Sequence, residues 1–314
     1  MKQIFVVILM ALAIVGLAAC QQQNTTNVGP TFVGGTQGLS LEFVQDAPPD
    51  NIFDGAKYPF TVNIKMKNVG EWEIPTGANI KASISGIDPT DYGVTAAALV
   101  KNPLQGMLST RRGPSGEVIE GDTLVMDFSG LNYQRTLFGD VASTFKADVC
   151  YQYGTKVSSN ICIKKDLSST DTSVCIVNEE KAVANSGAPI QITSLRESQG
   201  GTDKILMTLT IKHLGEGKVF GMGTGCSNAI QNRDKVYLKI DTGMTGLSCT
   251  GMQTSAGQPA TGSEGYVVLF NNERQISCTQ PTGGQGDYLK TMSATLEYDY
   301  DQFITKEITV KHVS

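Results

Sequence analysis

Hydrophobic and polar residues alternate along several short stretches of the chain. The clearest stretch is residues 60–67, where apolar and polar side chains take turns without interruption. A period of two with one polar face is typical of a strand in a sheet that is covered on one side. Similar alternation predicts strands at residues 39–44, 79–84 and 123–128. The one helical candidate, residues 94–106, ends at Asn102-Pro103, so we expect at most one or two turns there.

Residues 144–164 predict a hairpin, because two alternating stretches flank Gly154-Thr155-Lys156. A turn centred on Lys156 places Cys150 opposite Cys162 on neighbouring strands, close enough for a disulfide. By elimination, the other predicted pairs are Cys249 with Cys278 and Cys175 with Cys226.

The sequence contains an internal repeat at an offset of about 146 residues. Residues 147–153 match 294–300, residues 161–164 match 308–311, and residues 64–71 match 209–216. The same β unit is therefore expected twice. We predict two tandem β-sandwich domains, at residues 37–167 and 172–314, joined by a short polar linker.

The N-terminus has the pattern of a secretory signal. Residues 4–19 are uncharged and mostly apolar, and Lys2 precedes them. The ending Leu17-Ala18-Ala19-Cys20 resembles the lipobox of prokaryotic lipoproteins, which implies cleavage of residues 1–19 and a lipid on Cys20. Two alternatives stay open. One is an uncleaved anchor, for which the apolar run is short, and the other is plain secretion with Cys20 free or disulfide-bonded.

Residues 20–36 are polar and then rich in Gly, Pro and Thr, without apolar periodicity. We therefore expect a flexible tether between the lipid and the first domain. Within it, Asn24-Thr25-Thr26 fits the acceptor pattern for N-glycosylation.

Composition narrows the function. Charged residues are only 18% and Gly reaches 34, which suits an all-β secreted protein with many turns. The net charge of −5 and the lack of a basic run argue against binding nucleic acid. Six cysteines remain beside Cys20, and an even number in an exported chain indicates disulfides. Without a Cys-x-x-Cys motif and with only two histidines, no metal site is expected.

No arrangement for catalysis stands out. His213 sits at an expected turn and His312 near the C-terminus, so neither has an evident nucleophile to activate. Glu297, Asp299 and Asp301 alternate along one strand, either as Ca²⁺ ligands or as an acidic solvent face. We expect neither an enzyme nor a cofactor.

Two loops, residues 243–265 and residues 226–232, are the first candidates for binding. Residues 221–225 read as a flexible glycine loop rather than a phosphate site, because no Lys follows. Trp72, the only tryptophan, is either a core residue or an exposed contact. The candidate binding residues in these loops are Cys226, Asn228, Asn232 and Cys249.

The strand that closes in Lys67-Asn68-Val69-Gly70-Glu71 resembles the signature of CARDB-type and related immunoglobulin-like domains of archaeal and bacterial surface proteins. Its echo at residues 212–216 has His213 where that signature has Asn. The resemblance implies two immunoglobulin-like β-sandwiches that serve surface display or adhesion, without catalysis.

Together these patterns predict a lipid-anchored structural or adhesion protein on the outer face of the cell membrane. Its expected partners are the membrane, through Cys20, and other cell-surface proteins or glycans. The alternative is a surface lipoprotein that presents a small molecule or carbohydrate to a transporter or enzyme complex. An enclosed pocket lined by aromatic side chains would favour the alternative.

Overall fold

The computed structural model describes residues 31–284 and 286–313. Strands make up 53% of the chain, and the only helices among the described residues are short 3₁₀ turns. The expected all-β sandwich class is therefore confirmed, whereas the number of domains stays a prediction. None of the described helices has the length and hydrophobicity to span a membrane.

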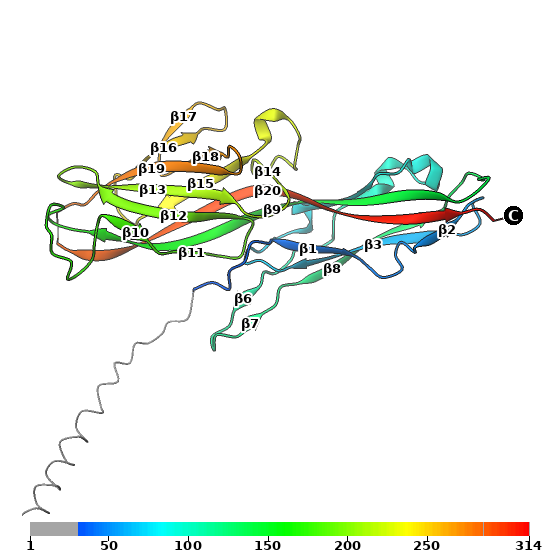
Figure 1. Ribbon diagram of the computed structural model, residues 1–314, viewed down its shortest axis with the longest axis horizontal. Helices are drawn as coiled ribbons and strands as arrows, with labels where there is room; N and C mark the ends of the chain where they lie inside the picture. The colour runs from blue at the N-terminus through cyan, green and yellow to red at the C-terminus, as the bar shows by residue number, and fades with distance from the viewer. Residues whose placement is uncertain (1–30, 285, 314) are drawn as a thin grey trace, which may run out of the picture. The chain divides into compact units, whose positions relative to one another are not determined.

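The strands fall into three sheets (Figure 1). In chain order they are β1 (Leu39–Phe43), β2 (Asn51–Phe53), β3 (Phe60–Asn68), β4 (Ile80–Ser85), β5 (Val100–Lys101), β6 (Arg111–Arg112), β7 (Val118–Ile119), β8 (Thr123–Leu131), β9 (Val141–Ile163), β10 (Glu179–Lys181), β11 (Val183–Asn185), β12 (Ile190–Gln199), β13 (Lys204–His213), β14 (Lys218–Phe220), β15 (Lys235–Asp241), β16 (Ser248–Gln253), β17 (Pro259–Gly262), β18 (Glu264–Val268), β19 (Glu273–Pro281) and β20 (Tyr288–Lys311). A small sheet has the order β1-β3-β8, β6 pairs with β7, and the other strands form the large sheet.

The predicted alternation in β3 is confirmed. Val62, Ile64 and Met66 are fully buried, while the residues between them are partly exposed. The helical candidate at residues 94–106 is only a 3₁₀ turn, Ala96–Leu99, followed directly by β5.

Two long strands, β9 and β20, organise the large sheet. They have 23 and 24 residues and pair antiparallel from Val141↔Val310 to Ile163↔Tyr288 without a register shift. The predicted hairpin at residues 144–164 is therefore wrong. Gly154 lies in mid-strand, where the ring of Trp72 approaches to 2.8 Å from the position of a Cβ atom. The glycine makes room for a side chain and does not form a turn.

Each long strand carries neighbours from both repeat copies. β9 pairs with β4 along one part and with β11 along another, and β20 pairs with β15 and, further on, with β2. Residues Phe32–Ser314 form one compact unit. We call the predicted ranges 37–167 and 172–314 the first and second halves. The longest strand of each half thus pairs with strands of both halves. The division of the chain into two separate domains stays a prediction.

The repeat seen in the sequence recurs in the strand pairing. In the first half β3 lies between β1 and β8, and in the second half β13 lies between β12 and β19. β4 pairs with β9 at Lys146–Tyr151, and β15 pairs with the matching part of β20 at Ser293–Glu297. The two copies therefore share one strand arrangement.

The end of the predicted tether is bound to the folded body. The backbone N–H groups of Val33 and Gly34 donate to the Glu71 carboxylate at 2.9 and 2.8 Å, and that of Gly187 does so at 2.7 Å. Flexibility is thus the wrong expectation for residues 33 and 34. Cys20 and the rest of the signal and tether through residue 30, with Asn24, lie outside the described residues.

All six cysteines predicted to form disulfides do so, but two predicted pairs are wrong. Cys150 bonds Cys226, with Cα atoms 6.0 Å apart, and Cys162 bonds Cys175, at 5.7 Å. Because β9 is continuous, Cys150 and Cys162 lie roughly 40 Å apart along one extended strand. The third pair, Cys249 with Cys278, is confirmed and joins directly opposed residues of β16 and β19.

Candidate functional site

Four buried tyrosines lie where the two long strands cross the middle of the molecule. Tyr151 is paired with Tyr300 and Tyr153 with Tyr298 in the β9–β20 ladder. They are the repeated tyrosines of residues 147–153 and 294–300. The two copies of this repeated segment thus pair with each other in the β9–β20 ladder.

The hydroxyl groups of this cluster bind the two repeated turns, at residues 67–71 and 212–217. Tyr153 Oη donates to Asn68 Oδ1 at 2.9 Å, while Tyr300 Oη lies 3.1 Å from His213 Nε2 and accepts from the Gly217 backbone at 2.7 Å. His213 therefore occupies the place of Asn68 in the second copy and contacts the equivalent phenol. Burial lowers the pKa of His213, which favours the neutral imidazole.

The hydroxyl groups of the other two tyrosines, Tyr151 and Tyr298, also contact polar groups inside the protein. Tyr151 Oη donates to Gln302 Oε1 at 3.0 Å, and Tyr298 Oη lies 3.4 Å from Thr155 Oγ1. Burial raises the pKa of Tyr300 to about 12. This cluster therefore holds the two halves together and offers no acidic phenol for catalysis.

The glycine loop at residues 221–225 binds the carboxylate of Asp299, a residue of the same chain. Asp299, only 1% exposed, accepts from Gly223 N at 3.0 Å and from Gly225 N at 2.6 Å. The expectation of a flexible loop is therefore wrong, because a carboxylate and the Cys150–Cys226 disulfide hold it. Asp299 is also not part of an acidic solvent face.

The other candidate binding residues divide into surface and core. Asn228 is exposed, and its carbonyl accepts from Arg233 Nε at 2.8 Å. The Asn232 carbonyl accepts from Gly221 N at 2.7 Å. Cys249 is fully buried in β16, so it is not a loop residue. The expected long loop at residues 243–265 instead contains β16 and β17 and runs into β18, with shorter turns between them.

A pocket of about 320 Å³, here called the Trp72 pocket, lies beside the glycine loop at residues 221–225. Its walls include Trp72, Lys156, Met222 and Glu297. Lys156 Nζ lies 5.8 Å from the Trp72 ring centroid. An indole, a thioether and both signs of charge suit an amphipathic or planar ligand. Sequence reasoning missed Lys156 here because residues 154–156 were expected to form a turn.

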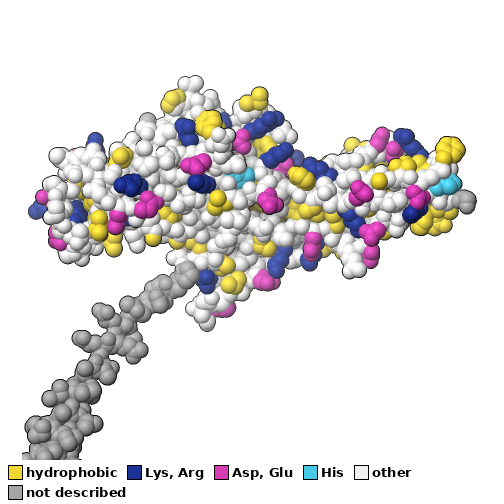
Figure 2. All heavy atoms as spheres, viewed as in Figure 1, with side chains coloured by type: hydrophobic (Ala, Val, Ile, Leu, Met, Phe, Trp, Pro, Cys, Tyr) yellow, Lys and Arg dark blue, Asp and Glu magenta, His cyan; other side chains and the backbone are white. Residues whose placement is uncertain are grey.

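Exposed aromatic side chains lie near the C-terminal residues, at the end of β2 and in the segments 54–59 and 132–140. Phe53, Tyr58 and Phe138 are 38%, 50% and 108% exposed, and we call them the aromatic tip. Figure 2 shows hydrophobic side chains collected at this end of the molecule, beside a histidine. The Phe53 and Tyr58 rings contact each other at 5.0 Å between centroids.

Buried Asp54 fixes the loops behind the aromatic tip. Its carboxylate accepts from Leu137 N at 2.7 Å and Val313 N at 3.0 Å, and lies 2.8 Å from His312 Nδ1. The hydrogen bond from His312, with those from the two backbone amides, lowers the pKa of Asp54 to about 2. His312 is thus a structural residue, next to an exposed apolar surface.

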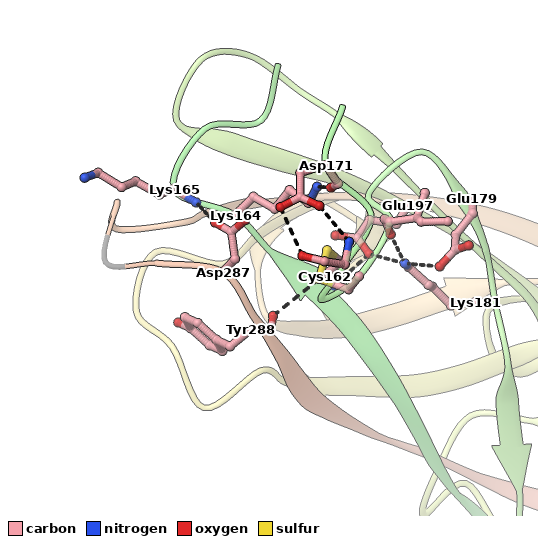
Figure 3. Close-up of a disulfide and its surroundings, with 12 residues drawn as sticks. Cys162, Lys164, Lys165, Asp171, Glu179, Lys181, Glu197, Asp287 and Tyr288 are labelled. Carbon is pink, nitrogen blue, oxygen red and sulfur yellow. Dashed lines mark hydrogen bonds and ion pairs between the residues drawn. A yellow bond between two sulfur atoms is a disulfide. The ribbon is translucent and has the colours of Figure 1, made fainter. Parts of the chain in front are cut away.

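A buried ion pair lies next to the Cys162–Cys175 disulfide (Figure 3). Glu197 is fully buried, and its Oε2 accepts from Cys162 N at 2.9 Å and lies 3.1 Å from Lys181 Nζ. Among the described residues, its Oε1 atom has no hydrogen-bond partner. Burial raises the pKa of Glu197 to about 7, against the attraction of Lys181.

This raised pKa predicts a pH-dependent stability. The folded state holds the proton more tightly than the unfolded chain, so the stabilisation is complete below pH ~4.5 and is lost as the pH rises through ~7. We expect the free energy of unfolding to fall by about 2 kcal/mol between pH 5 and pH 7. Urea titrations at both pH values check this, with Glu197→Gln removing most of the difference. An equally steep decline in Glu197→Gln would assign it to another group.

Comparisons with known proteins do not assign a family. No protein-family model matches the sequence, and neither does any curated protein. Among solved structures, the collagen binding domain of Erysipelothrix rhusiopathiae surface protein RspB is 10% identical, with 88% of this chain and 90% of that chain covered and a TM-score of 0.14. An allantoicase is 12% identical, with 83% and 92% covered and a TM-score of 0.14. Scores this low carry no argument about fold or function.

Proposed function

We propose that this protein is a lipid-anchored structural or adhesion protein on the outer face of the cell membrane, without catalytic activity. The observation that carries the proposal is the aromatic tip. Large aromatic side chains exposed together on a secreted protein usually mark a contact surface. The loops that bear them are held by Asp54, so the surface is formed before any partner arrives.

The disulfides and long strands support this role. Cys150 in the first half is bonded to Cys226 in the second, and β9 of the first half pairs along its whole length with β20 of the second. A load applied between the halves is therefore borne by covalent bonds and a long hydrogen-bonded ladder. Such a body suits a protein that displays a contact surface.

Cells that display the Tyr58→Ser, Phe138→Ser double variant are expected to attach to surfaces or to one another at least ~10-fold less than wild type, because truncated aromatic anchors lose most contact energy. Leu104→Ser is the matched control, since Leu104 is 106% exposed but lies outside the tip. Equal attachment of the double variant and the control would rule out the aromatic tip as the adhesive surface.

The anchor is tested separately. Mass spectrometry of the mature N-terminus is expected to find a lipid on Cys20, and Cys20→Ala is expected to release the protein from the membrane. An unmodified Cys20 would end the lipoprotein part of the proposal and leave the adhesive part standing.

The Trp72 pocket favours a second candidate, the presentation of a small molecule or carbohydrate. Because Trp72 is the only tryptophan, its fluorescence reports directly on this pocket. A saturable change in emission with a sugar or an aromatic metabolite, lost in Lys156→Ala, would favour ligand presentation over adhesion.

A further inference from the structure

The outer edge of β20 is unpaired in its middle. One edge of this strand pairs with β9 throughout. The other edge pairs with β15 and β14 up to Asp301 and with β2 from Thr309 onward. Within the described part of the chain, no strand pairs with residues 302–308 on this side, which we call the β20 edge.

The register shows which main-chain groups face outward. Thr309 N donates to Asp50 O of the segment leading into β2, so odd-numbered residues direct their N–H and C=O groups to this side. The ladder with β9 has no register shift, so the same parity holds for Phe303, Thr305 and Glu307. Their side chains are exposed as well. The β20 edge therefore offers three outward-facing donors and acceptors in a row.

The equivalent edge in the other repeat copy is filled. There β11 pairs antiparallel with Val157–Ser159 of β9, the residues that match 304–306 of β20. β11 comes from the segment just before β12, and the corresponding segment before β1 is residues 32–34. In that segment Val33 N and Gly34 N instead donate to Glu71. The repeat thus leaves an open strand position beside residues 304–306 of β20, because the segment that corresponds to β11 binds Glu71 instead.

A pocket of about 480 Å³ lies beside the β20 edge, between β1 and β20. Leu41, Leu214, Phe303 and Ile304 contribute its apolar surface. A strand added to the β20 edge would direct alternate side chains toward this pocket. The pocket therefore selects an apolar side chain within the added strand.

The flanking strands limit what can bind. β14 ends the open stretch on one side, and β2 with the segment before it ends it on the other, where Lys306 Nζ donates to Pro48 O at 2.7 Å. This leaves room for a strand of about five residues. The 24-residue β20 of a second copy would collide with both. The occupant is therefore a short extended segment whose ends leave the plane of the sheet.

We propose that the β20 edge binds an extended peptide segment of a partner protein by strand addition, antiparallel to β20, with an apolar side chain in the adjacent pocket. The proposal deepens the proposed contact function and rests on it for the existence of a partner. It needs neither the lipid nor the aromatic tip.

The test uses a synthetic peptide of residues 180–188, the β11 segment that fills the equivalent edge, added to the full chain. Amide hydrogen exchange at Phe303, Thr305 and Glu307 is expected to be fast in the free protein and to slow at least ~10-fold with peptide. The amides of Ile304 and Lys306, which face β9, should be protected in both states and serve as internal controls.

A matched pair of variants isolates strand addition. Thr305→Pro removes one outward N–H at a position where an edge strand tolerates proline, and it is expected to abolish the peptide-induced protection. Thr305→Ala keeps the N–H and is expected to retain it.

Several results would overturn the proposal. They are no protection with peptide up to ~1 mM, unchanged peptide binding by Thr305→Pro, protection in the free protein at every concentration, or protection that rises with protein concentration. The third result would show a segment of the same chain on the edge, and the fourth a second copy. If peptide binding fails, the predictions of attachment through the aromatic tip and of a lipid on Cys20 are not affected.

Discussion

Gly70→Ala is expected to lower the free energy of unfolding by at least ~3 kcal/mol. A Cβ atom at this position would lie 2.2 Å from Tyr153 Oη and 2.5 Å from the carbonyl oxygens of Gln37 and Gly187. Two of these contacts are with backbone, which cannot rotate away as a flexible side chain does. The third displaces the hydroxyl that binds Asn68. The substitution therefore disturbs both the turn at residues 67–71 and the tyrosine cluster.

Urea denaturation followed by tyrosine and tryptophan fluorescence measures the effect. Gly139→Ala is the matched control, because no atom of the described residues lies within 4 Å of a Cβ atom there, and it is expected to change stability by less than ~0.5 kcal/mol. If Gly70→Ala unfolded at the same urea concentration as Gly139→Ala, the close approach of the turn to Tyr153 would be wrong.

Cys150→Ser combined with Cys226→Ser is expected to cost about 4.5 kcal/mol. The two cysteines are separated by 76 residues, and closing a loop of that length removes much of the freedom of the unfolded chain. The loss also frees the glycine loop, since Cys226 directly follows Gly225, which donates to Asp299. Thermal unfolding is therefore expected to begin at a lower temperature and to expose this loop first.

The control for this prediction is the short disulfide. Cys162 and Cys175 are separated by only 13 residues, so replacing both with serine is expected to cost about 3 kcal/mol and to leave the glycine loop in place. Limited proteolysis within residues 221–232 distinguishes the two pairs. Cleavage there in both variants, or in neither, would contradict a specific role for Cys150–Cys226.

Local patterns in the sequence were sufficient where the determining contacts are local. The alternation in residues 60–67 fixes which face of β3 is buried, because neighbouring side chains of a strand point to opposite sides. The repeat likewise predicts the matching strands of the two halves from the sequence alone. Cys249 and Cys278 were paired correctly, although only by elimination.

The long strands could not be recognised in the same way. A glycine in an alternating stretch marks either a turn or a close approach of another group. At Gly154 the decisive neighbour is Trp72, which is remote in sequence. A turn at that stretch places Cys150 opposite Cys162, and both wrong disulfide pairs follow from that prediction.

The candidate site also depends on contacts between residues that are far apart in the sequence. The amides of residues 223 and 225 bind Asp299, which lies more than seventy residues later in the chain. No local motif indicates that partner. The Trp72 pocket likewise joins residues from four separate segments, and the aromatic tip depends on a carboxylate, Asp54, that bridges two loops and the C-terminal residues.

The most direct test of this account is to express residues 37–167 alone. In this fragment β9 would lack β20, which pairs with it along its whole length. The C-terminal part of β9 would also lack β11. The account therefore predicts that this fragment shows no cooperative thermal unfolding and a collapsed amide spectrum, and that it folds only when the second half is supplied. A fragment that unfolds cooperatively with well-dispersed amide signals would contradict it and would establish two independent tandem domains.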